Sequence, residues 1–350
     1  MPSPSEALRV GVVGVGSFGR NHARVYCDLQ SDPTRNVRLV GVVDSDFSLA
    51  QSVAKKFSTS AFRSIPELIQ AGVQAVSVAA PTAAHLEVAG QLMEKGVDVL
   101  VEKPLAPTVA EADEMIGLAE RYGCIAQVGH LERFNPAVRA TLPLLTQPMF
   151  FEVHRLSVFT PRSLDVDVVL DLMIHDIDIV LTFTKSAVKE VRAVGLPILS
   201  AKTDIANVRM EFESGCVANF TASRVSTERV RKLRFFQPRQ YVSLDYSRQD
   251  VLVLTIDNAA PGPADLDSFN PVSVAASVLP GITPFKPGIE AQEPLRAELT
   301  SFVDTVRERS TPEVTLADGR RALAVATMVV EAIAEHSRHV RLPELTRAES

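Results

Sequence analysis

Features that define several classes of protein are missing from this chain of 350 residues. It has only three cysteines, Cys27, Cys124 and Cys216, and none forms a Cys-x-x-Cys pair, so neither a disulfide framework nor a zinc knuckle is indicated. No apolar run reaches the roughly eighteen residues that a membrane span needs, and the first eight residues hold no apolar signal core. We therefore expect a protein of a reducing compartment, the cytoplasm.

An excess of positive charge is also missing. Lysine and arginine number 36 against 42 aspartate and glutamate residues, and the net charge is -6. This balance argues against partners such as nucleic acid or an anionic membrane surface, and it favours small metabolites. The length and the hydrophobic content of 46% allow a sizeable core and predict two domains.

The first part of the chain alternates short β-branched runs with longer amphipathic stretches. Strands separated by helices imply right-handed βαβ units and an α/β fold of the Rossmann type, with a doubly wound parallel sheet. We predict this domain over residues 1–130, with strands over 8–13, 39–43, 75–79, 97–101 and 125–128.

After about residue 148 the pattern changes to long strand-like stretches, which suit a large, open, mostly antiparallel sheet. These stretches are 149–159, 189–198, 206–225 and 233–254. We predict an α+β domain over residues 131–350 for substrate binding and oligomerisation, whose C-terminal helices over 294–309 and 317–336 pack back on the first domain. Thr108 and Asn135 are expected helix caps, because Glu111 and Pro136 follow them at the favoured positions.

The first chemical motif is Gly14-x-Gly16-x-x-Gly19, between the first predicted strand and a helical segment. In this context Gly14 allows a tight turn, Gly16 lets the backbone approach a pyrophosphate, and Gly19 lets the helix pack closely on the strand. Asp44 ends the second strand, where a carboxylate can accept both ribose hydroxyls of an adenosine. A surface turn over 44–46 is the alternative. Because Ser45 and Asp46 offer no cation for a 2'-phosphate, NAD is favoured over NADP.

Two further segments follow predicted strands at the edge where such sheets bind ligands. Pro81, Thr82 and His85 follow the third strand, and we assign them to the rim of the cofactor site, although His85 could instead cap a helix or face solvent. Glu102-Lys103-Pro104 follows the fourth strand. Pro104 fixes the backbone locally, and a nearby nicotinamide cation would disfavour the ammonium form of Lys103. The cofactor set is completed by Ser17 and Phe18 of the glycine loop.

The third motif lies in an apolar helix over 168–181. Asp167, Asp171, His175 and Asp178 follow one another at helical spacing and predict one polar stripe directed into a cavity. Asp171 can accept from one ring nitrogen of His175 and leave the other as a proton acceptor. The alternatives are a buried histidine satisfied by an aspartate, or a zinc site, for which no third nitrogen or sulfur ligand lies at recognisable spacing. We predict no metal.

Together, the glycine motif, Glu102-Lys103-Pro104 and Asp171-x-x-x-His175 resemble the glucose-fructose oxidoreductase, inositol dehydrogenase and MocA-type family over essentially the whole chain. The resemblance implies a dehydrogenase that acts on a CH–OH group. In this interpretation His175, oriented by Asp171, removes a hydroxyl proton while hydride passes to the nicotinamide, and Lys103 holds that hydroxyl.

Within the family, residues 128–136, 154–162 and 219–224 resemble bacterial UDP-N-acetylglucosamine 3-dehydrogenases. That resemblance implies NAD-dependent formation of a 3-oxo nucleotide sugar, which a pyridoxal-phosphate aminotransferase converts to the 3-amino sugar of some lipid A molecules. A guanidinium fork matches phosphate oxygens, so the arginines of these stretches are candidates for the diphosphate, although each could be an exposed strand residue. The substrate candidates are Arg133, Asn135, Arg155, Arg162 and Arg224.

Other functions stay open from the sequence. One is NAD-dependent oxidation of an inositol or a free sugar, and another is a non-catalytic dinucleotide-sensing regulator. Retention of Lys103 and His175 argues against the regulator, and the arginine-containing stretches favour a nucleotide sugar. Because an open sheet with an apolar face needs covering, we expect a homodimer or homotetramer.

Overall fold

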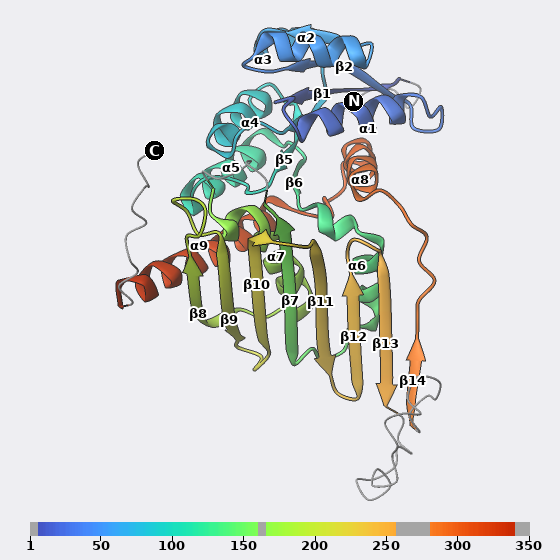
Figure 1. The fold of residues 1–350 in the computed structure, drawn as a ribbon. Coiled ribbons are helices and arrows are strands. Elements are labelled where there is room, and N and C mark those ends of the chain that lie inside the picture. The colour runs from blue at the N-terminus through green and yellow to red at the C-terminus, as the bar shows by residue number, and fades with distance from the viewer. Residues whose placement is uncertain (1–5, 160–165, 257–280, 340–350) are drawn as a thin grey trace, which may run out of the picture. The chain divides into compact units, whose positions relative to one another are not determined.

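The computed structural model describes residues 6–159, 166–256 and 281–339. The chain divides into two compact units: unit 1 comprises residues 1–134 and 292–324, and unit 2 comprises residues 135–291 and 325–350 (Figure 1). Each unit is therefore built from two stretches of chain, and one boundary falls inside helix α9, Leu316–His339. None of the helices in the described ranges combines the length and the apolarity needed to cross a membrane.

Unit 1 contains a parallel sheet of six strands in the order β3-β2-β1-β4-β5-β6. The prediction of a doubly wound α/β sheet is confirmed. The order reverses at β1, and the crevice at such a switch point is where ligands bind in sheets of this kind. The strands are β1 Leu8–Val13, β2 Val37–Val43, β3 Ser60–Phe62, β4 Ala75–Val78, β5 Asp98–Glu102 and β6 Ala126–Gly129.

The helices of unit 1 form two packed groups. Helix α1 contacts α8, while α3, α4 and α5 contact one another in succession. A buried apolar cluster that includes Val10, Tyr26, Leu39 and Phe302 joins β1, α1, β2 and α8. The helices are α1 Gly19–Gln30, α2 Phe47–Lys56, α3 Ile65–Gln70, α4 His85–Met93, α5 Val109–Tyr122, α8 Pro294–Glu308 and the first part of α9, with short 3-10 turns at Thr82–Ala84 and Leu131–Phe134.

Both predicted helix caps are confirmed. The Thr108 hydroxyl accepts from the Glu111 N–H at 3.2 Å at the start of α5, and the same hydroxyl donates to the Glu111 carboxylate at 3.1 Å. Asn135 caps helix α6, Pro136–Thr141, by accepting from the Ala137 N–H at 3.1 Å. Proline at the first helical position leaves no orphan donor there.

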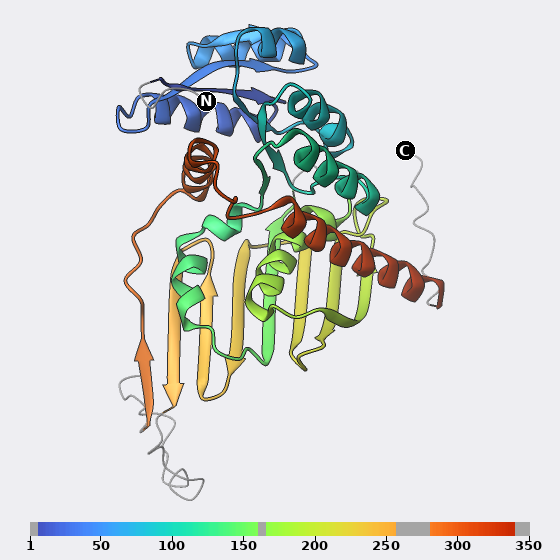
Figure 2. The same cartoon turned by 180° about the vertical axis from the view of Figure 1, so that it is seen from behind.

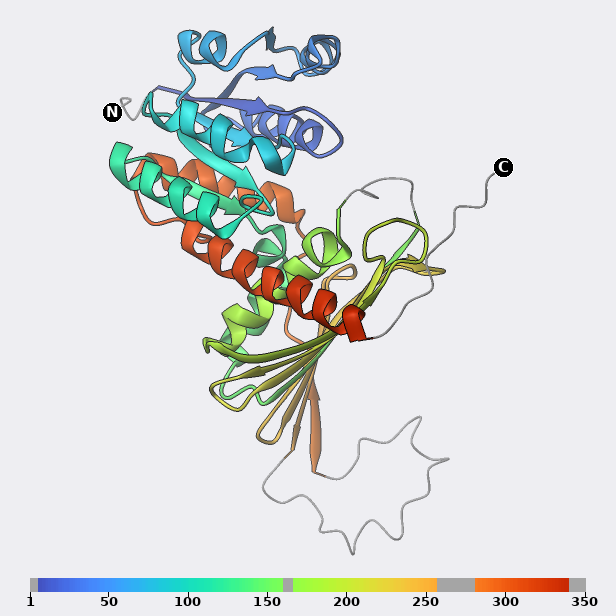
Figure 3. The ribbon, with the colours of Figure 1, turned by 90° about the vertical axis from the view of Figure 1, so that its left-hand side faces the viewer.

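Unit 2 contains an eight-stranded sheet in the order β14-β13-β12-β11-β7-β10-β9-β8. The predicted large, mostly antiparallel sheet is confirmed, and the one parallel pair among the described strands of this sheet is β7 with β10. Helix α6 and helix α7, Ile174–Thr184, lie against one face of this sheet, and no described helix covers the other (Figures 1, 2 and 3). The strands are β7 Phe150–Val158, β8 Val188–Leu196, β9 Ile205–Phe212, β10 Val217–Ser226, β11 Val230–Gln237, β12 Gln240–Asp245, β13 Asp250–Ile256 and β14 Ile282–Phe285.

Several element boundaries differ from the expected ones. Strand β3 has only three residues, too few to show a period, and the sequence pattern missed it. The long stretches over 206–225 and 233–254 are broken by turns at Gly215, Arg239 and Gln249, all with positive φ. The helix expected over 168–181 begins as a π-helix, Val169–Met173, and continues as α7, Ile174–Thr184.

Candidate functional site

The glycine loop of unit 1 lies between β1 and α1. A Cβ on Gly14, whose φ is +82°, would lie 2.5 Å from the Ala80 N atom, and a Cβ on Gly19 would lie 1.8 Å from the Gly14 oxygen. The predicted tight turn and close packing are therefore confirmed. A Cβ on Gly16 would meet no atom within 4 Å. Open space at this glycine, near the N-terminus of α1, fits a dinucleotide pyrophosphate, and this role of Gly16 stays a prediction.

Asp44 joins the end of β2 to the glycine loop. Its Oδ2 accepts from the Val15 N–H at 2.7 Å, and its Oδ1 accepts from the Asp46 N–H at 2.9 Å. Asp46 has a separate function as the N-cap of α2, accepting from the N–H groups of Ser48 and Leu49. The Asp44 carboxylate thus lies against the glycine loop, and its binding of a ribose stays a prediction.

Two loops of unit 1 meet around His85. Its Nδ1 lies 3.0 Å from the Pro104 oxygen and 3.2 Å from the Leu105 oxygen, and its Nε2 lies 2.9 Å from the Ala80 oxygen. The prediction that His85 lies on the rim of the site needs correction, because the residue is 1% exposed. Burial lowers the pKa of the imidazole, against the effect of the surrounding carbonyl groups and Glu102. His85 ties the loop after β4 to the loop after β5.

Those two loops present the other predicted residues of this edge. Pro81 is exposed, Thr82 begins a 3-10 turn, and Lys103 is half-buried directly after β5. Glu102, the last residue of β5, is 7% exposed. The peptide between Lys103 and Pro104 is cis. Of the Glu-Lys-Pro motif, the lysine side chain is therefore the more accessible charged group.

Unit 2 carries Asp171 and His175 where the π-helix passes into α7. Both residues are half-buried, whereas Met173, Ile174 and Asp176 between and beside them are buried. The π-helix has more than four residues per turn, and π-turns occur frequently at functional sites. The spacing of apolar and polar residues predicted a uniform α-helix, and this spacing does not distinguish a π-turn from an α-turn.

The predicted polar stripe is shorter than expected. Asp178 is 1% exposed, in a part of α7 where every residue from Asp176 to Leu181 is buried. The stripe therefore ends at His175, because the next turn of the helix lies inside unit 2. The described stripe comprises Asp167, Asp171 and His175.

Arg155 on β7, predicted to bind a substrate phosphate, is 2% exposed. Its Nε and Nη2 atoms donate to the two carboxylate oxygens of Asp176 at 2.6 and 2.9 Å. The centroid of the Tyr246 ring lies 5.2 Å from the guanidinium carbon of Arg155. The guanidinium is committed to a buried ion pair, so we correct its expected role from substrate binding to structure.

Arg224 and Asn135 need a similar correction. Arg224 is 5% exposed, donates to the Val166 carbonyl and lies 3.5 Å from the Asp204 carboxylate. Asn135 is 2% exposed, and besides capping α6 it donates to the Tyr246 carbonyl at 3.0 Å. Sequence reasoning missed these partners because each comes from a remote segment.

Two substrate candidates remain. Arg133 is partly accessible, with 11% of its side chain exposed, and its Nη2 lies 3.7 Å from Asp318. Arg162 lies outside the described residues.

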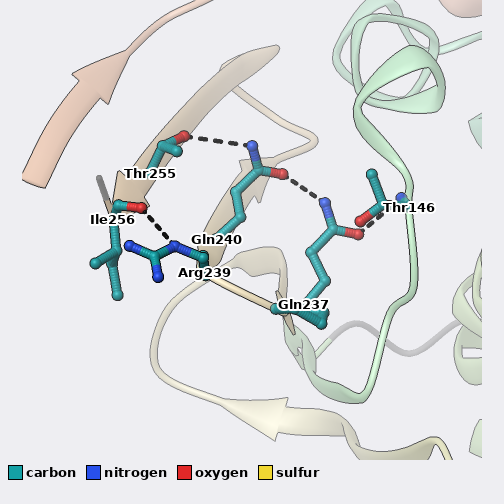
Figure 4. A pocket seen from close by; sticks show the side chains of 7 residues that line it. Thr146, Gln237, Arg239, Gln240, Thr255 and Ile256 are labelled. Atoms are coloured by element: carbon teal, nitrogen blue, oxygen red, sulfur yellow. Dashed lines mark hydrogen bonds between the residues drawn. The ribbon is translucent and has the colours of Figure 1, made fainter. Parts of the chain in front are cut away.

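The described pockets do not include the predicted site residues. One, of about 330 Å³, lies beside the β11–β12 turn, and Figure 4 shows that its polar side chains bond to one another, as Gln237 does to Gln240. A second, of about 450 Å³, is lined by Cys124, Arg309 and neighbouring residues of unit 1. Burial raises the pKa of Cys124 to about 11, so this thiol is a poor nucleophile. The described ranges contain no group of three or more histidine, cysteine, aspartate or glutamate residues that could hold a metal ion.

Comparison with known proteins identifies the family. The model of an oxidoreductase family with an NAD-binding Rossmann fold matches residues 8–130, and that of the GFO/IDH/MocA C-terminal domain matches residues 148–239. UDP-N-acetylglucosamine 3-dehydrogenase of Acidithiobacillus ferrooxidans is 34% identical over 327 residues, which cover 93% of this chain and 97% of that protein. The chain belongs to the GFO/IDH/MocA oxidoreductase family.

The similarity extends to solved structures and to a second curated relative. A solved structure of the Acidithiobacillus enzyme has a TM-score of 0.82 at 33% identity, covering 93% of this chain and 98% of that chain. Inositol 2-dehydrogenase of Rubrobacter xylanophilus is 30% identical over 204 residues, which cover 56% of this chain and 58% of that protein. The protein is thus an oxidoreductase in a family of NAD(P)-binding sugar dehydrogenases.

Proposed function

We propose that this protein oxidises the 3-hydroxyl of UDP-N-acetylglucosamine with NAD. The observation that carries the proposal is the match to UDP-N-acetylglucosamine 3-dehydrogenase along almost the full length of both chains. The match to the inositol enzyme covers little more than half of either protein. Lys103, Asp171 and His175 are all present, which favours an enzyme over a dinucleotide-sensing regulator.

Unit 1 supplies the residues that would hold the dinucleotide. The open space at Gly16 and the N-terminal amides of α1 would receive the pyrophosphate, with Ser17 and Phe18 alongside. The Asp44 carboxylate would accept the ribose hydroxyls, and it would repel the extra phosphate of NADP. Pro81, Thr82 and the Glu102-Lys103 segment complete the proposed cofactor set, while His85 shapes their loops from within.

When bound, the dinucleotide would supply the hydride acceptor for oxidation at C3 of the sugar. His175 takes the hydroxyl proton, Asp171 fixes the imidazole tautomer, and the Lys103 ammonium donates to the same hydroxyl oxygen and polarises it. Arg133 and Arg162 are the remaining candidates for the substrate diphosphate.

The test is growth of NADH absorbance with purified protein and NAD. UDP-N-acetylglucosamine, myo-inositol and glucose are supplied in turn, with glutamate and a pyridoxal-phosphate aminotransferase present to remove the ketone. We expect turnover with the nucleotide sugar only. Turnover with inositol or glucose alone would assign a free-sugar dehydrogenase, and none with any of them would favour the regulator.

Variants test the proposed residues. Lys103→Ala and His175→Ala should each lower kcat by about 10²- to 10⁴-fold, the usual range for a general acid or base. Arg133→Ala should instead raise KM for the nucleotide sugar. Wild-type kcat in both alanine variants would exclude the proposed mechanism.

Partners follow from the proposed product. A 3-oxo nucleotide sugar is a ketone that a pyridoxal-phosphate aminotransferase can convert to the 3-amino sugar for lipid A, and we propose such an enzyme as the next step.

We also propose a homodimer or homotetramer, because no described helix covers one face of the eight-stranded sheet. Sedimentation equilibrium would give the number of subunits.

A further inference from the structure

Three buried acid–base side chains of unit 1 lie around the end of β5 and are not part of the proposed reaction. His22 on α1 and Glu298 on α8 are both 0% exposed, and Glu102 is 7% exposed. We call these three residues the Glu102 cluster. Buried ionisable groups are costly unless they are paired, so a cluster next to a candidate catalytic lysine needs an explanation.

The Glu102 carboxylate is held on three sides. Its Oε1 lies 3.0 Å from His22 Nε2, and its Oε2 accepts from the backbone N–H of Lys103 at 3.3 Å. On the third side it packs against Gly129, where an added Cβ would lie 2.7 Å from Oε1. Any movement of this carboxylate would therefore disturb the backbone of Lys103.

His22 connects the carboxylate to the glycine loop. Its ring meets the Phe18 ring edge-on, with the centroids 5.4 Å apart and the planes at 61°. Phe18 is the N-cap residue of α1 and 40% exposed. A continuous series of contacts thus runs from Phe18 through His22 and Glu102 to the Lys103 backbone.

We propose that His22 and Glu102 form a positioning pair, which fixes the Lys103 backbone and couples it to the dinucleotide loop. This proposal rests on the proposed function, since it assumes that Lys103 acts on the substrate. Neither residue needs to touch the substrate, and both act through Lys103.

The third member keeps the charge of the cluster low. Burial raises the pKa of Glu298 well above its ordinary value, and the charges of Glu102 and Glu313 raise it further. Both effects favour the protonated, neutral form of Glu298. The charge of Glu102 also acts on His85 on α4, where it raises the pKa of the imidazole against the larger effect of burial. The titratable groups around Glu102 are therefore His22, His85, Glu298 and the adjacent Lys103.

A double-mutant cycle with NAD and UDP-N-acetylglucosamine tests the coupling. We expect His22→Leu to lower kcat tenfold or more in the parent protein, because small misplacements of a catalytic group cost that much, and less than twofold in Lys103→Ala. His22→Gln, which keeps a side-chain N–H, should recover most of the loss. Tyr26→Phe, one turn along α1 and also buried, is the control and should keep the parent kcat.

An equal loss from His22→Leu in both backgrounds would overturn the positioning role and leave the proposed function intact. No turnover of UDP-N-acetylglucosamine with NAD by the parent protein would instead overturn the proposed function. The two failures are therefore distinguishable.

Hydrogen–deuterium exchange of the protein without ligands gives a second readout. In His22→Leu, and in Glu102→Gln if the leucine variant does not fold, we expect the Lys103 amide to exchange at least tenfold faster while the amides of β5 and α1 keep their protection. Faster exchange over all of β5 and α1 would indicate a structural role only and would overturn the proposal, as would an unchanged Lys103 amide.

Discussion

Arg155 and Asp176 form a two-point ion pair inside unit 2, with N···O distances of 2.6 and 2.9 Å and each side chain only 2% exposed. The pair joins β7 to α7, the helix that begins next to His175. Removing one partner would leave the other charge buried without compensation.

We expect Asp176→Asn to lower the free energy of unfolding by about 3 to 5 kcal/mol, the usual cost of breaking a buried pair. Urea unfolding followed by circular dichroism measures it. Glu190→Gln is the matched control, since Glu190 pairs with Arg192 at the surface, where side chains are 46% and 77% exposed. That exchange should cost less than about 1 kcal/mol. Equal losses in the two variants would contradict the assignment of Arg155 to structure.

Two glycines of the same loop should respond oppositely to alanine. Gly19→Ala would place a Cβ 1.8 Å from the Gly14 oxygen, so the variant should fail to fold or melt well below the parent. Gly16→Ala meets no atom within 4 Å, so its melting temperature should stay within about 2 °C of the parent. The added methyl should nevertheless weaken NADH binding, measured by calorimetry, tenfold or more. Parent-like binding in Gly16→Ala would rule out the pyrophosphate role.

Asp44→Asn should alter cofactor preference. The substitution removes the charged acceptor proposed for the ribose hydroxyls, and a hydrogen bond to a charged group contributes about 1.5 to 3 kcal/mol, or tenfold or more in affinity. We expect the Kd for NADH to rise and that for NADPH to fall, measured by fluorescence titration. Asp46→Asn is the control: its amide oxygen still accepts at the N-cap of α2, and the preference should stay unchanged. A cofactor preference that changes in Asp46→Asn and not in Asp44→Asn would contradict the role of Asp44.

Glu298 should make stability depend on pH. Its pKa in the folded protein is raised well above 4.5, chiefly by burial, whereas the unfolded chain has the ordinary value. Below that ordinary value both states hold the proton. As the pH rises through it, only the unfolded chain ionises, so the folded state loses up to about 1.4 kcal/mol per pH unit until the folded pKa is reached.

Glu298→Gln abolishes this loss, because an amide does not ionise. We therefore expect the glutamine variant to gain more than about 1 kcal/mol relative to the parent between pH 5 and pH 8, by urea unfolding. Glu308→Gln is the control, because it replaces an exposed carboxyl at the end of the same helix and should not give this dependence on pH. A stability difference between Glu298→Gln and the parent that stays constant with pH would show that Glu298 is charged in the folded protein.

The features predictable from sequence were those set by local geometry. The packing of Gly14 and Gly19, the caps at Thr108 and Asn135, and the position of Asp44 at the end of β2 all depend on residues within one turn or one strand end. The sheets followed from runs of β-branched residues, except β3, which is too short to have a pattern.

The features missed depend on remote partners. An arginine on a strand has the same sequence pattern whether it meets a phosphate or, like Arg155, an aspartate of another element. His22, Glu102 and Glu298 come together from three elements, and a helical period cannot show it. The π-turn before His175 was missed because its residues would also suit an α-helix.

The interleaving of the two units along the chain has a consequence for engineering. A chimaera that takes one unit from this protein and the other from a relative cannot be made with a single junction near residue 134. It needs further junctions near residues 291 and 324, and the last of these falls within α9. Fusion there must keep the helical register, so that Gly319 still faces Val128 and Ile333 still faces Gly195.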